Sequence, residues 1–433
     1  MKLNKNKSFW AAVIVLALES YDYVIFLFLA RGAHWIFLGH ELDPILFLLN
    51  VILGFTARPI GGLLFGVLAD KWGRKPLLMS TTVLMGIFTL VIGLVPFSKG
   101  FIATNAAFIL IVFKALQGAI FGSDFIITNT YLSEIASKGK RGFYCSFSHV
   151  AQEIGTLLAI FVSLGFVLVP DSIFINEQGW RIPFISGSLS MFLGIHLRYG
   201  LLESPNYLLL KSKGIAHSNP LTNLFKKYRI QVLKMFLIIP VIGINFYFFR
   251  VYILNQANVL LNIKVELILI LSSLACIANM VTAALGGYLS DLVGRKPILI
   301  SGAMGILLFS WPTLVLVNHP GEVHMVFIRM LVGQLIMALF AGLYSGAISS
   351  YMAELFGTKV RNTGAALTYN LAISLISGVM PLLNLYLFQG RIGIVNLADE
   401  IANWILRKKT PFVRLRDNIH RKPLIPLEQI VFL

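Results

Sequence analysis

The sequence GVLADKWGRKP occupies residues 66–76, and a closely similar sequence, GYLSDLVGRKP, occupies residues 287–297. A second set of residues recurs at nearly the same separation along the sequence, because Tyr131 and Glu134 are matched by Tyr351 and Glu354. The chain therefore contains an internal duplication of two long units. The duplicated residues are Gly66, Asp70, Gly73, Arg74, Lys75, Glu134 and Arg141, and their counterparts are Gly287, Asp291, Gly294, Arg295, Lys296, Glu354 and Arg361.

The length of the repeat restricts the class of fold. Solenoids and propellers repeat every 20–50 residues or so, whereas each unit here is long enough to be a domain of its own. Both motif copies lie between long apolar runs, which places their charges in short loops between membrane helices. The duplication thus predicts two similar helical bundles in a membrane.

The composition supports this prediction. Of 433 residues, 57% are hydrophobic and 13% are charged, and the mean hydropathy is +0.80, whereas soluble domains carry about 25% charged residues. The net charge of +17 fits cytoplasmic loops of a membrane protein, and no basic run is interleaved with stacking aromatic residues as nucleic-acid binding requires. Cys145 and Cys276 form neither a disulfide framework nor a zinc site, so we expect no metal and no cofactor.

Apolar stretches of bilayer-crossing length, about 20 residues, divide the chain. We predict an N-terminal six-helix bundle over residues 1–203, a cytoplasmic basic linker over 204–230, a C-terminal bundle over 231–406 and a basic tail over 407–433. The expected spans are 9–30, 45–69, 77–97, 101–124, 146–169 and 182–202 in the first half, then 232–254, 266–289, 297–317, 325–350 and 364–388 in the second.

Basic residues predict the orientation of these spans. With a cytoplasmic N-terminus, both motif loops and the linker lysines fall on the cytoplasmic side, as the positive-inside rule requires. The C-terminus fits less well, because the expected twelfth span around residues 391–409 carries Asp399 and Glu400 at its centre. Each carboxylate costs about 2.5–3.5 kcal/mol there, so this last helix is either degenerate or missing.

Charged residues inside the spans are candidate functional groups, because ionisable side chains in a bilayer are costly. Glu19 and Asp22 are three residues apart and share a helix face. Arg31, Arg181 and Arg198 lie near span ends, where we expect them to reach the interface. The alternative for Arg58, Lys114 and Arg329 is structural ion pairing with Asp22, Asp124 or Glu153. The candidates for substrate binding or proton coupling are Glu19, Asp22, Arg58, Lys114, Asp124, Glu153, Arg250 and Arg329.

The duplicated loops suggest a conformational role. Gly66 and Gly73 allow close helix approach and a tight turn, and Asp70 is able to meet the N-terminus of a neighbouring helix. The loops would hold the two halves together in one conformation and release them in another. The alternative is that each loop only anchors the topology.

The doubled loop G-x-x-x-D-[KL]-x-G-R-K resembles the signature of the major facilitator superfamily. Further segments resemble its metabolite:proton symporter family, which includes proline/betaine, 2-oxoglutarate, citrate and shikimate carriers. The resemblance implies an all-α membrane fold of two six-helix bundles related by pseudo-two-fold symmetry, with alternating access coupled to protons. One departure is Gly122-Ser123-Asp124, where the family has Gly-Gly-Glu. These segments are LESYDYVIF (18–26), QGAIFGSD (117–124), KRGFY (140–144), GWRIPF (179–184), LLESPNY (201–207) and AELFGTKVRNTG (353–364).

The sequence thus predicts a secondary transporter and not an enzyme: a proton symporter of a small carboxylate-bearing metabolite, either an organic acid or an osmolyte such as proline or betaine. No G-x-x-x-x-G-K-[ST] loop supplies an ATP site. The alternatives are a non-transporting sensor or a decayed carrier, then a channel or a membrane enzyme. The expected partners are substrate, protons and the lipid bilayer, with no nucleic acid, for a monomer in a bacterial inner membrane.

Overall fold

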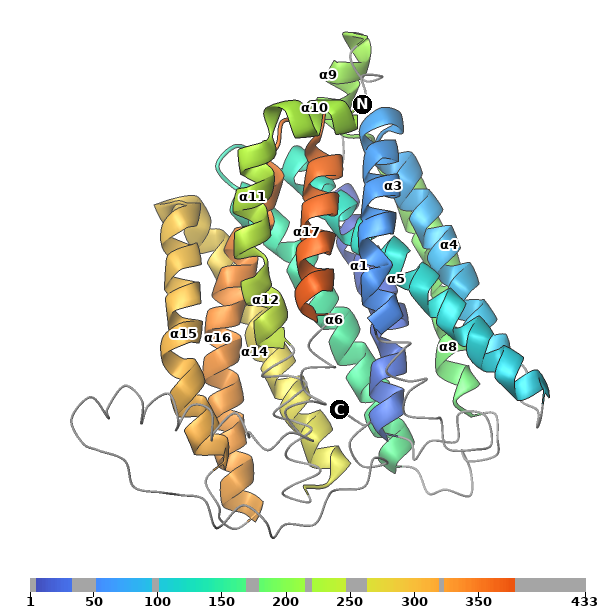
Figure 1. Cartoon of the computed structure of the whole chain (residues 1–433), viewed down its shortest axis with the longest axis vertical. Helices are drawn as coiled ribbons and strands as arrows, with labels where there is room; N and C mark the ends of the chain where they lie inside the picture. Colours follow the sequence, from blue (N-terminus) through green and yellow to red (C-terminus); the bar gives the residue numbers. More distant parts are fainter. Residues whose placement is uncertain are drawn as a thin grey trace, which may run out of the picture.

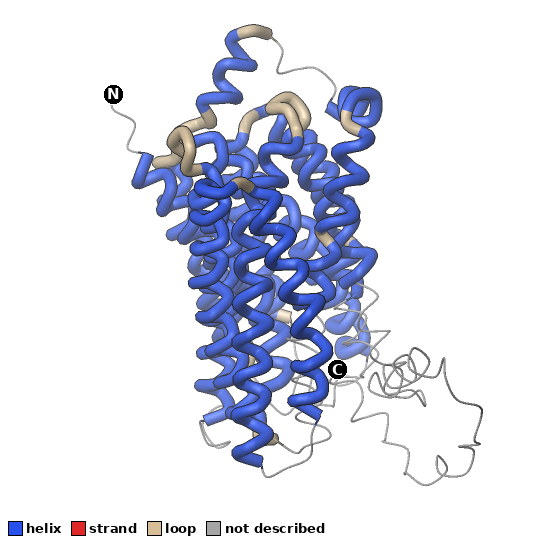
Figure 2. Tube along the Cα trace, turned by 90° about the vertical axis from the view of Figure 1, so that its left-hand side faces the viewer, coloured by secondary structure: helices blue, strands red, loops and turns tan. Residues whose placement is uncertain are grey.

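The computed structural model describes residues 5–32, 52–95, 101–168, 179–214, 220–246, 263–318 and 323–377, and every regular element in this part of the chain is a helix (Figure 2). Two short helices, α9 (Pro205–Ser212) and α10 (Pro220–Lys227), separate two groups of longer ones. The first group is α1 (Lys5–Gly32), α3 (Arg58–Trp72), α4 (Arg74–Leu94), α5 (Phe101–Ile135), α6 (Arg141–Leu168) and α8 (Arg181–Tyr199). The second is α11 (Arg229–Ile238), α12 (Pro240–Asn245), α14 (Val265–Val293), α15 (Arg295–Asn318), α16 (Val323–Leu355) and α17 (Arg361–Ser377).

Length and composition make this an integral, multi-pass membrane protein. Eight of the described helices are long and apolar enough to cross a bilayer, and a ninth span results if α10 is counted with α11 and α12, from which it is bent by 84°. Each of the eleven expected spans contains a helix. The segment around residues 391–409 and the basic tail lie outside the described residues, and the domain boundaries stay a prediction.

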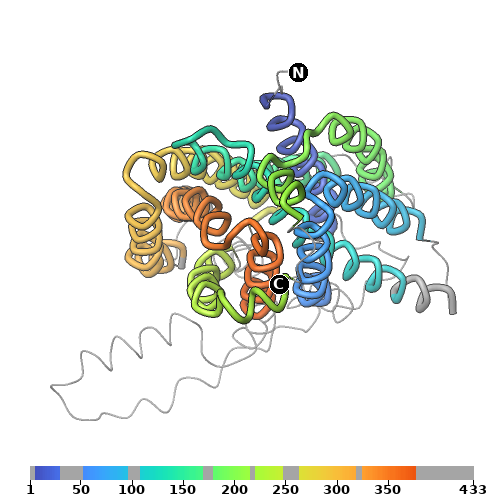
Figure 3. Tube along the Cα trace, turned by 90° about the horizontal axis from the view of Figure 1, so that it is seen from above, coloured from blue at the N-terminus to red at the C-terminus, as the bar shows by residue number. Residues whose placement is uncertain are grey.

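The helices form two groups that face each other. From above, the blue and cyan helices lie on one side and the orange-to-red ones on the other (Figure 3). The most extensive contacts between the groups are those of α6 with α14 and of α3 with α17, and α16 also packs on α6 and α17 on α5. Glycines of the duplicated motif allow this approach: a side chain at Gly66 would meet the α17 backbone at Asn362, and one at Gly287 would meet Ser146 on α6.

The duplicated loops, the start of α1 and the helices α9 and α10 all lie at one end of the bundle (Figure 1). We call this end, which carries residues 70–75 and 291–296, the motif end. Each motif loop turns at a glycine with positive φ, 108° at Gly73 and 95° at Gly294, a conformation that other residues rarely adopt. These two turns separate α3 from α4 and α14 from α15. The largest hydrophobic cluster also joins the halves, with Phe125 and Tyr369 rings 5.2 Å apart.

Candidate functional site

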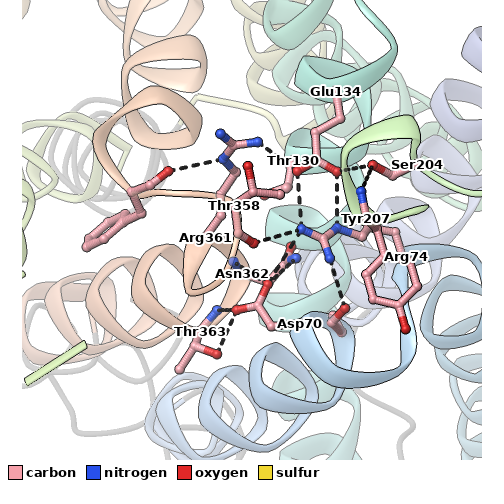
Figure 4. Close-up of polar contacts among 12 residues, drawn as sticks. Asp70, Arg74, Thr130, Glu134, Ser204, Tyr207, Thr358, Arg361, Asn362 and Thr363 are labelled. Carbon is pink, nitrogen blue, oxygen red and sulfur yellow. Dashed lines mark hydrogen bonds and ion pairs between the residues drawn. The ribbon is translucent and has the colours of Figure 1, made fainter. Parts of the chain in front are cut away.

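Arg74 is the centre of a polar network at the motif end (Figure 4). Its guanidinium is fully buried, and it donates two hydrogen bonds of 3.1 Å to the carboxylate of Glu134 on α5. It also donates to the backbone carbonyl of Ala69 at 3.2 Å and lies 3.6 Å from the Asp70 carboxylate. A bidentate pair of this kind is among the stronger polar contacts in proteins, so Arg74 fixes the turn between α3 and α4 against α5.

The same network joins the two halves of the molecule. Asp70 accepts hydrogen bonds from the backbone N–H groups of Asn362 at 3.2 Å and Thr363 at 2.9 Å, at the start of α17. Arg361 donates to the Glu134 carboxylate at 2.7 Å, and Arg74 reaches the carbonyl of Thr358 at 3.2 Å. A carboxylate at a helix N-terminus is favourable because it pairs otherwise unbonded N–H groups. Asp70 and Glu134 therefore hold the motif ends of the two halves together.

Residues after α8 complete this first copy. The Glu203 carboxylate accepts from the backbone N–H groups of Arg74 at 3.0 Å and Lys75 at 3.2 Å, which caps the start of α4. Ser204 donates to Glu134 and accepts from the N–H of Tyr207 as the cap of α9. Burial, followed by the nearby Glu203 charge, raises the pKa of Tyr207. The segment 203–207 is thus part of the network.

The second copy is arranged differently. Asp291 accepts from the backbone N–H groups of Gly142 at 2.8 Å and Phe143 at 2.9 Å, at the start of α6. Arg295 pairs with Asp291 at 2.8 Å and with Glu354 at 2.9 Å. Arg295 keeps 18% of its side chain exposed and Glu354 keeps 32%. Arg141, the counterpart of Arg361, is exposed.

Inside the first half, Arg198 lies between two of the candidate acids. It is fully buried and contacts Glu19 on α1 at 2.9 Å and Asp124 on α5 at 2.8 Å. The expectation that Arg198 reaches the membrane interface is wrong, because α1, α4 and α5 enclose the end of α8 that carries it. The partner of Glu19 and Asp124 is therefore Arg198, and not Arg58 or Lys114.

Asp22, Lys114 and Arg58 form a separate buried group. Lys114 interacts electrostatically with both Asp22 and Arg58, and its ammonium donates to the Tyr23 carbonyl at 2.7 Å. The Arg58 guanidinium lies over the rings of Phe55 and Tyr23, 4.3 and 4.8 Å from their centres. Two polar atoms of this group, Asp22 Oδ1 and Arg58 Nε, are buried with no hydrogen-bond partner. Such orphan atoms are rare in proteins unless a ligand, ion or water satisfies them.

A small cavity of about 30 Å³ lies between the halves. His149 and Glu153 on α6 line it from the first half, and their Nε2 and Oε1 atoms are 3.6 Å apart. Asn245 on α12 and Asn279 on α14 line it from the second half, and each has one buried side-chain atom without a hydrogen-bond partner. Of the remaining candidates, Arg329 lies on α16, far along the helix from Glu354, and Arg250 lies outside the described residues.

Comparisons with known proteins agree with this architecture. A family model described as "Sugar (and other) transporter" matches residues 45–227 and again 214–390. The citrate-proton symporters of Salmonella typhi and Klebsiella pneumoniae are each 30% identical, over 84% and 86% of this chain and 83% of theirs. The proton:xylose symporter XylE, a major facilitator superfamily structure, superposes with a TM-score of 0.71 at 19% identity, covering 93% of this chain and 95% of XylE.

The chain belongs to the major facilitator superfamily. Its fold is the major facilitator fold, and it is a membrane transporter of the sugar (and other) transporter family. A putative proline/betaine transporter of Staphylococcus haemolyticus is also similar, at 27% identity over 89% of this chain and 82% of its own length. The duplication in the sequence corresponds to the two facing helix groups of this family's fold.

Several residues of the transporter's network were not predicted as site residues. Asn362 and Thr363 follow Arg361 directly, and Glu203 with Ser204 lies in the segment LLESPNY. The Ser-Pro pair in that segment is a helix-start signal, which would have indicated a capped helix beside the motif loop. Arg198 carried no such signal, because its burial depends on three neighbouring helices.

Proposed function

We propose that this transporter carries a small organic acid in symport with protons. The observation that carries the proposal is the buried group of Asp22, Lys114 and Arg58, in which Asp22 Oδ1 and Arg58 Nε lack hydrogen-bond partners. Two cations and one acid leave a net positive charge that suits a carboxylate ligand, and arginine binds carboxylates with a planar fork. The names of the citrate-proton symporters support the same class of substrate.

The surrounding aromatic rings favour an organic acid over betaine. A quaternary ammonium needs open ring faces, but Arg58 already lies over Tyr23, Phe55 and Phe121. Lys114 lies over Tyr23 and Phe26, 4.9 and 5.3 Å from the ring centres. The faces of these rings are therefore occupied by Arg58 and Lys114 and are not open to the quaternary ammonium of betaine.

The same group offers a means of coupling. Among the cations of this group, Lys114 is the one whose charge favours the ionised form of Asp22. A substrate carboxylate that takes over Lys114 leaves Asp22 as an uncompensated buried anion, which is costly unless the acid takes up a proton. Binding of the anion and binding of the proton therefore favour each other, as symport requires.

We assign the rest of the substrate to the cavity between the halves. Asn245 and Asn279 supply amide groups with free hydrogen-bonding capacity, and Glu153 with His149 supplies an ionisable pair from the opposite half. Closure of the two halves on a polar ligand there would link binding to the rocking motion. The roles of Arg250 and Arg329 in binding stay predictions.

We also infer that the motif end faces the cytoplasm. Lys5 and Lys7 begin α1 at this end, and the exposed lysines of α9 and α10 lie there as well (Figure 1). This concentration of basic residues follows the positive-inside rule. The conformation described is then closed towards the cytoplasm.

The decisive experiment is uptake by proteoliposomes of labelled citrate, 2-oxoglutarate, proline and betaine, with and without an inward proton gradient. We expect gradient-driven uptake of an organic acid. Asp22→Asn should abolish gradient-driven uptake while exchange of labelled for unlabelled substrate continues. Arg58→Gln and Lys114→Gln should raise the KM for the acid at least tenfold, about 1.4 kcal/mol, whereas Lys213→Gln, a loss of an exposed lysine, serves as the matched control.

Two results would contradict the proposal. Uptake of betaine in preference to every acid would overturn the substrate class. Absence of both uptake and exchange, in protein that is folded by its thermal unfolding profile, would instead support a sensor or a decayed carrier.

A further inference from the structure

The side chain of Arg198 is held between two carboxylates in the interior of the first half. Its Nη1 atom is 2.9 Å from Glu19 Oε1 and 3.0 Å from Asp124 Oδ1. Its Nη2 atom is 3.1 Å from Glu19 Oε2 and 2.8 Å from Asp124 Oδ2. Each terminal nitrogen therefore contacts one oxygen of each acid, and all three side chains are at most 5% exposed.

The other groups that face these three side chains are neutral. From α4, Thr81 donates to Asp124 Oδ1 at 2.5 Å and Thr82 donates to Glu19 Oε1 at 2.9 Å. The Leu78 carbonyl on α4 accepts from Arg198, and Thr128 on α5 donates to Asp124 at 3.2 Å. The nearby acid on α1 is Asp22, which interacts with Lys114. His196 on α8 is exposed.

Charge balance then requires one more positive charge. With both acids ionised, the trio of Glu19, Asp124 and Arg198 has one excess negative charge, and a buried net charge costs several kcal/mol. Glu19 and Asp124 also contact the same two nitrogen atoms of Arg198, which brings their carboxyl groups close together. Two neighbouring carboxyl groups repel each other when both are ionised, so one of them tends to keep a proton, as in paired active-site acids.

We propose that Glu19 and Asp124 share one resident proton, and that this proton site is distinct from the one assigned to Asp22. The shared proton makes the trio neutral and allows both acids to stay bonded to Arg198. The site is a property of the folded protein without substrate. It therefore does not rest on the identity of the transported molecule.

The trio is connected to the motif end through α4 and α8, so loss of its proton affects the stability of that end. The trio joins α1, α5 and α8, and its hydrogen-bond partners on α4 begin at Leu78, one turn after Arg74. The α8 helix leads directly to Glu203, which caps the start of α4. Because the folded protein keeps a proton at neutral pH that the unfolded chain has already released, stability falls as the pH rises until this site loses its proton.

The test is infrared spectroscopy of the full-length protein in liposomes, which detects the C=O stretch of a protonated carboxyl group and its shift in D₂O. We expect one such band to be lost in Glu19→Gln and equally in Asp124→Asn, since either amide leaves a neutral pair with Arg198. Arg198→Gln should gain a band, because two adjacent acids without a cation both take protons. Glu354→Gln, which alters a partly exposed acid, is the matched control.

The outcomes are decisive in both directions. If neither Glu19→Gln nor Asp124→Asn removes a protonated-carboxyl band, the resident proton does not exist, whatever the transport assays give. A band removed by Asp22→Asn alone belongs to the coupling site and likewise excludes a proton shared by Glu19 and Asp124. Should a variant fail to fold, the pH dependence of wild-type thermal unfolding decides: a melting temperature that does not fall as the pH rises above neutrality overturns the proposal.

Discussion

At the first copy of the duplicated motif Arg74 is fully buried, whereas its counterpart Arg295 in the second copy keeps 18% of its side chain exposed. The first copy has three acids around its arginine and its backbone: Asp70, Glu134 and Glu203. The second copy has Asp291 and Glu354 among the described residues. We therefore expect the same residue types to contribute more to stability in the first copy than in the second.

The two copies also differ in how they connect the halves. In each copy an aspartate caps a helix of the opposite half, α17 for Asp70 and α6 for Asp291. Within the described residues, only the first copy adds a salt bridge between the two halves, because Arg361 pairs with Glu134 at 2.7 Å. The comparison teaches that the first copy is the stronger contact between the halves and the second is the weaker.

The largest expected difference concerns the two arginines. Arg74→Gln leaves Glu134 buried beside a single remaining cation, so we expect a loss of about 3–5 kcal/mol in the free energy of unfolding, together with loss of transport. Arg295→Gln removes partly exposed pairs and should cost about 1 kcal/mol or less. Chemical unfolding in detergent micelles measures both, and equal losses would remove the distinction between the two copies.

The two glutamates separate conformational effects from stability. Glu134→Gln weakens the contact with Arg361 across the halves, so we expect the population open at the motif end to rise on the order of tenfold. Glu354→Gln should leave that population unchanged. Spin labels at Lys138→Cys and Lys359→Cys, both exposed and on opposite halves, report the distance across the motif end. An unchanged distance distribution in Glu134→Gln would show that this salt bridge does not control opening.

The two aspartates compare the caps themselves. Asp70 accepts from the Thr363 hydroxyl at 2.8 Å and the Asn362 amide at 3.0 Å in addition to two backbone N–H groups. Asp70→Asn should therefore cost about 1–2 kcal/mol, and Asp291→Asn about 1 kcal/mol. Hydrogen exchange measured by mass spectrometry should show faster exchange at the start of α17 in the first variant and at the start of α6 in the second. Faster exchange at both helices in either variant would mean that the copies act as one unit.

Much of this comparison follows from the sequence, but its asymmetry does not. The constant offset between Asp70 and Asp291, and the long apolar runs around them, predicted the fold, the loops and their residues. The partners that make the first copy stronger, such as Glu203, lie outside the repeat, so periodicity carried no information about them.

The burial of Arg198 shows a second limit of sequence reasoning. Hydropathy along one chain segment places Arg198 near the end of a span, where a long side chain normally reaches the interface. Glu19 and Asp124 enclose it from helices that are distant in sequence. Matching the number of buried acids to buried bases across different spans would have indicated that these acids needed a nearby cation.

The smallest expected difference concerns the turn glycines, and it separates backbone strain from packing. Both Gly73→Ala and Gly294→Ala place a side chain at positive φ, which costs about 1–2 kcal/mol in either copy. At Gly294 the added carbon meets only Pro297 Cδ at 3.8 Å, whereas at Gly73 it meets the Glu203 carboxylate and the Tyr207 ring. We therefore expect Gly73→Ala to cost about 1 kcal/mol more, since it also displaces the cap of α4. That excess should disappear when both glycine variants are measured in a Glu203→Ala background, because the cap is then already absent. An excess that persists there would assign the difference to Tyr207, and equal costs in the wild-type background would mean that Glu203 moves aside freely and is not a fixed part of the first copy.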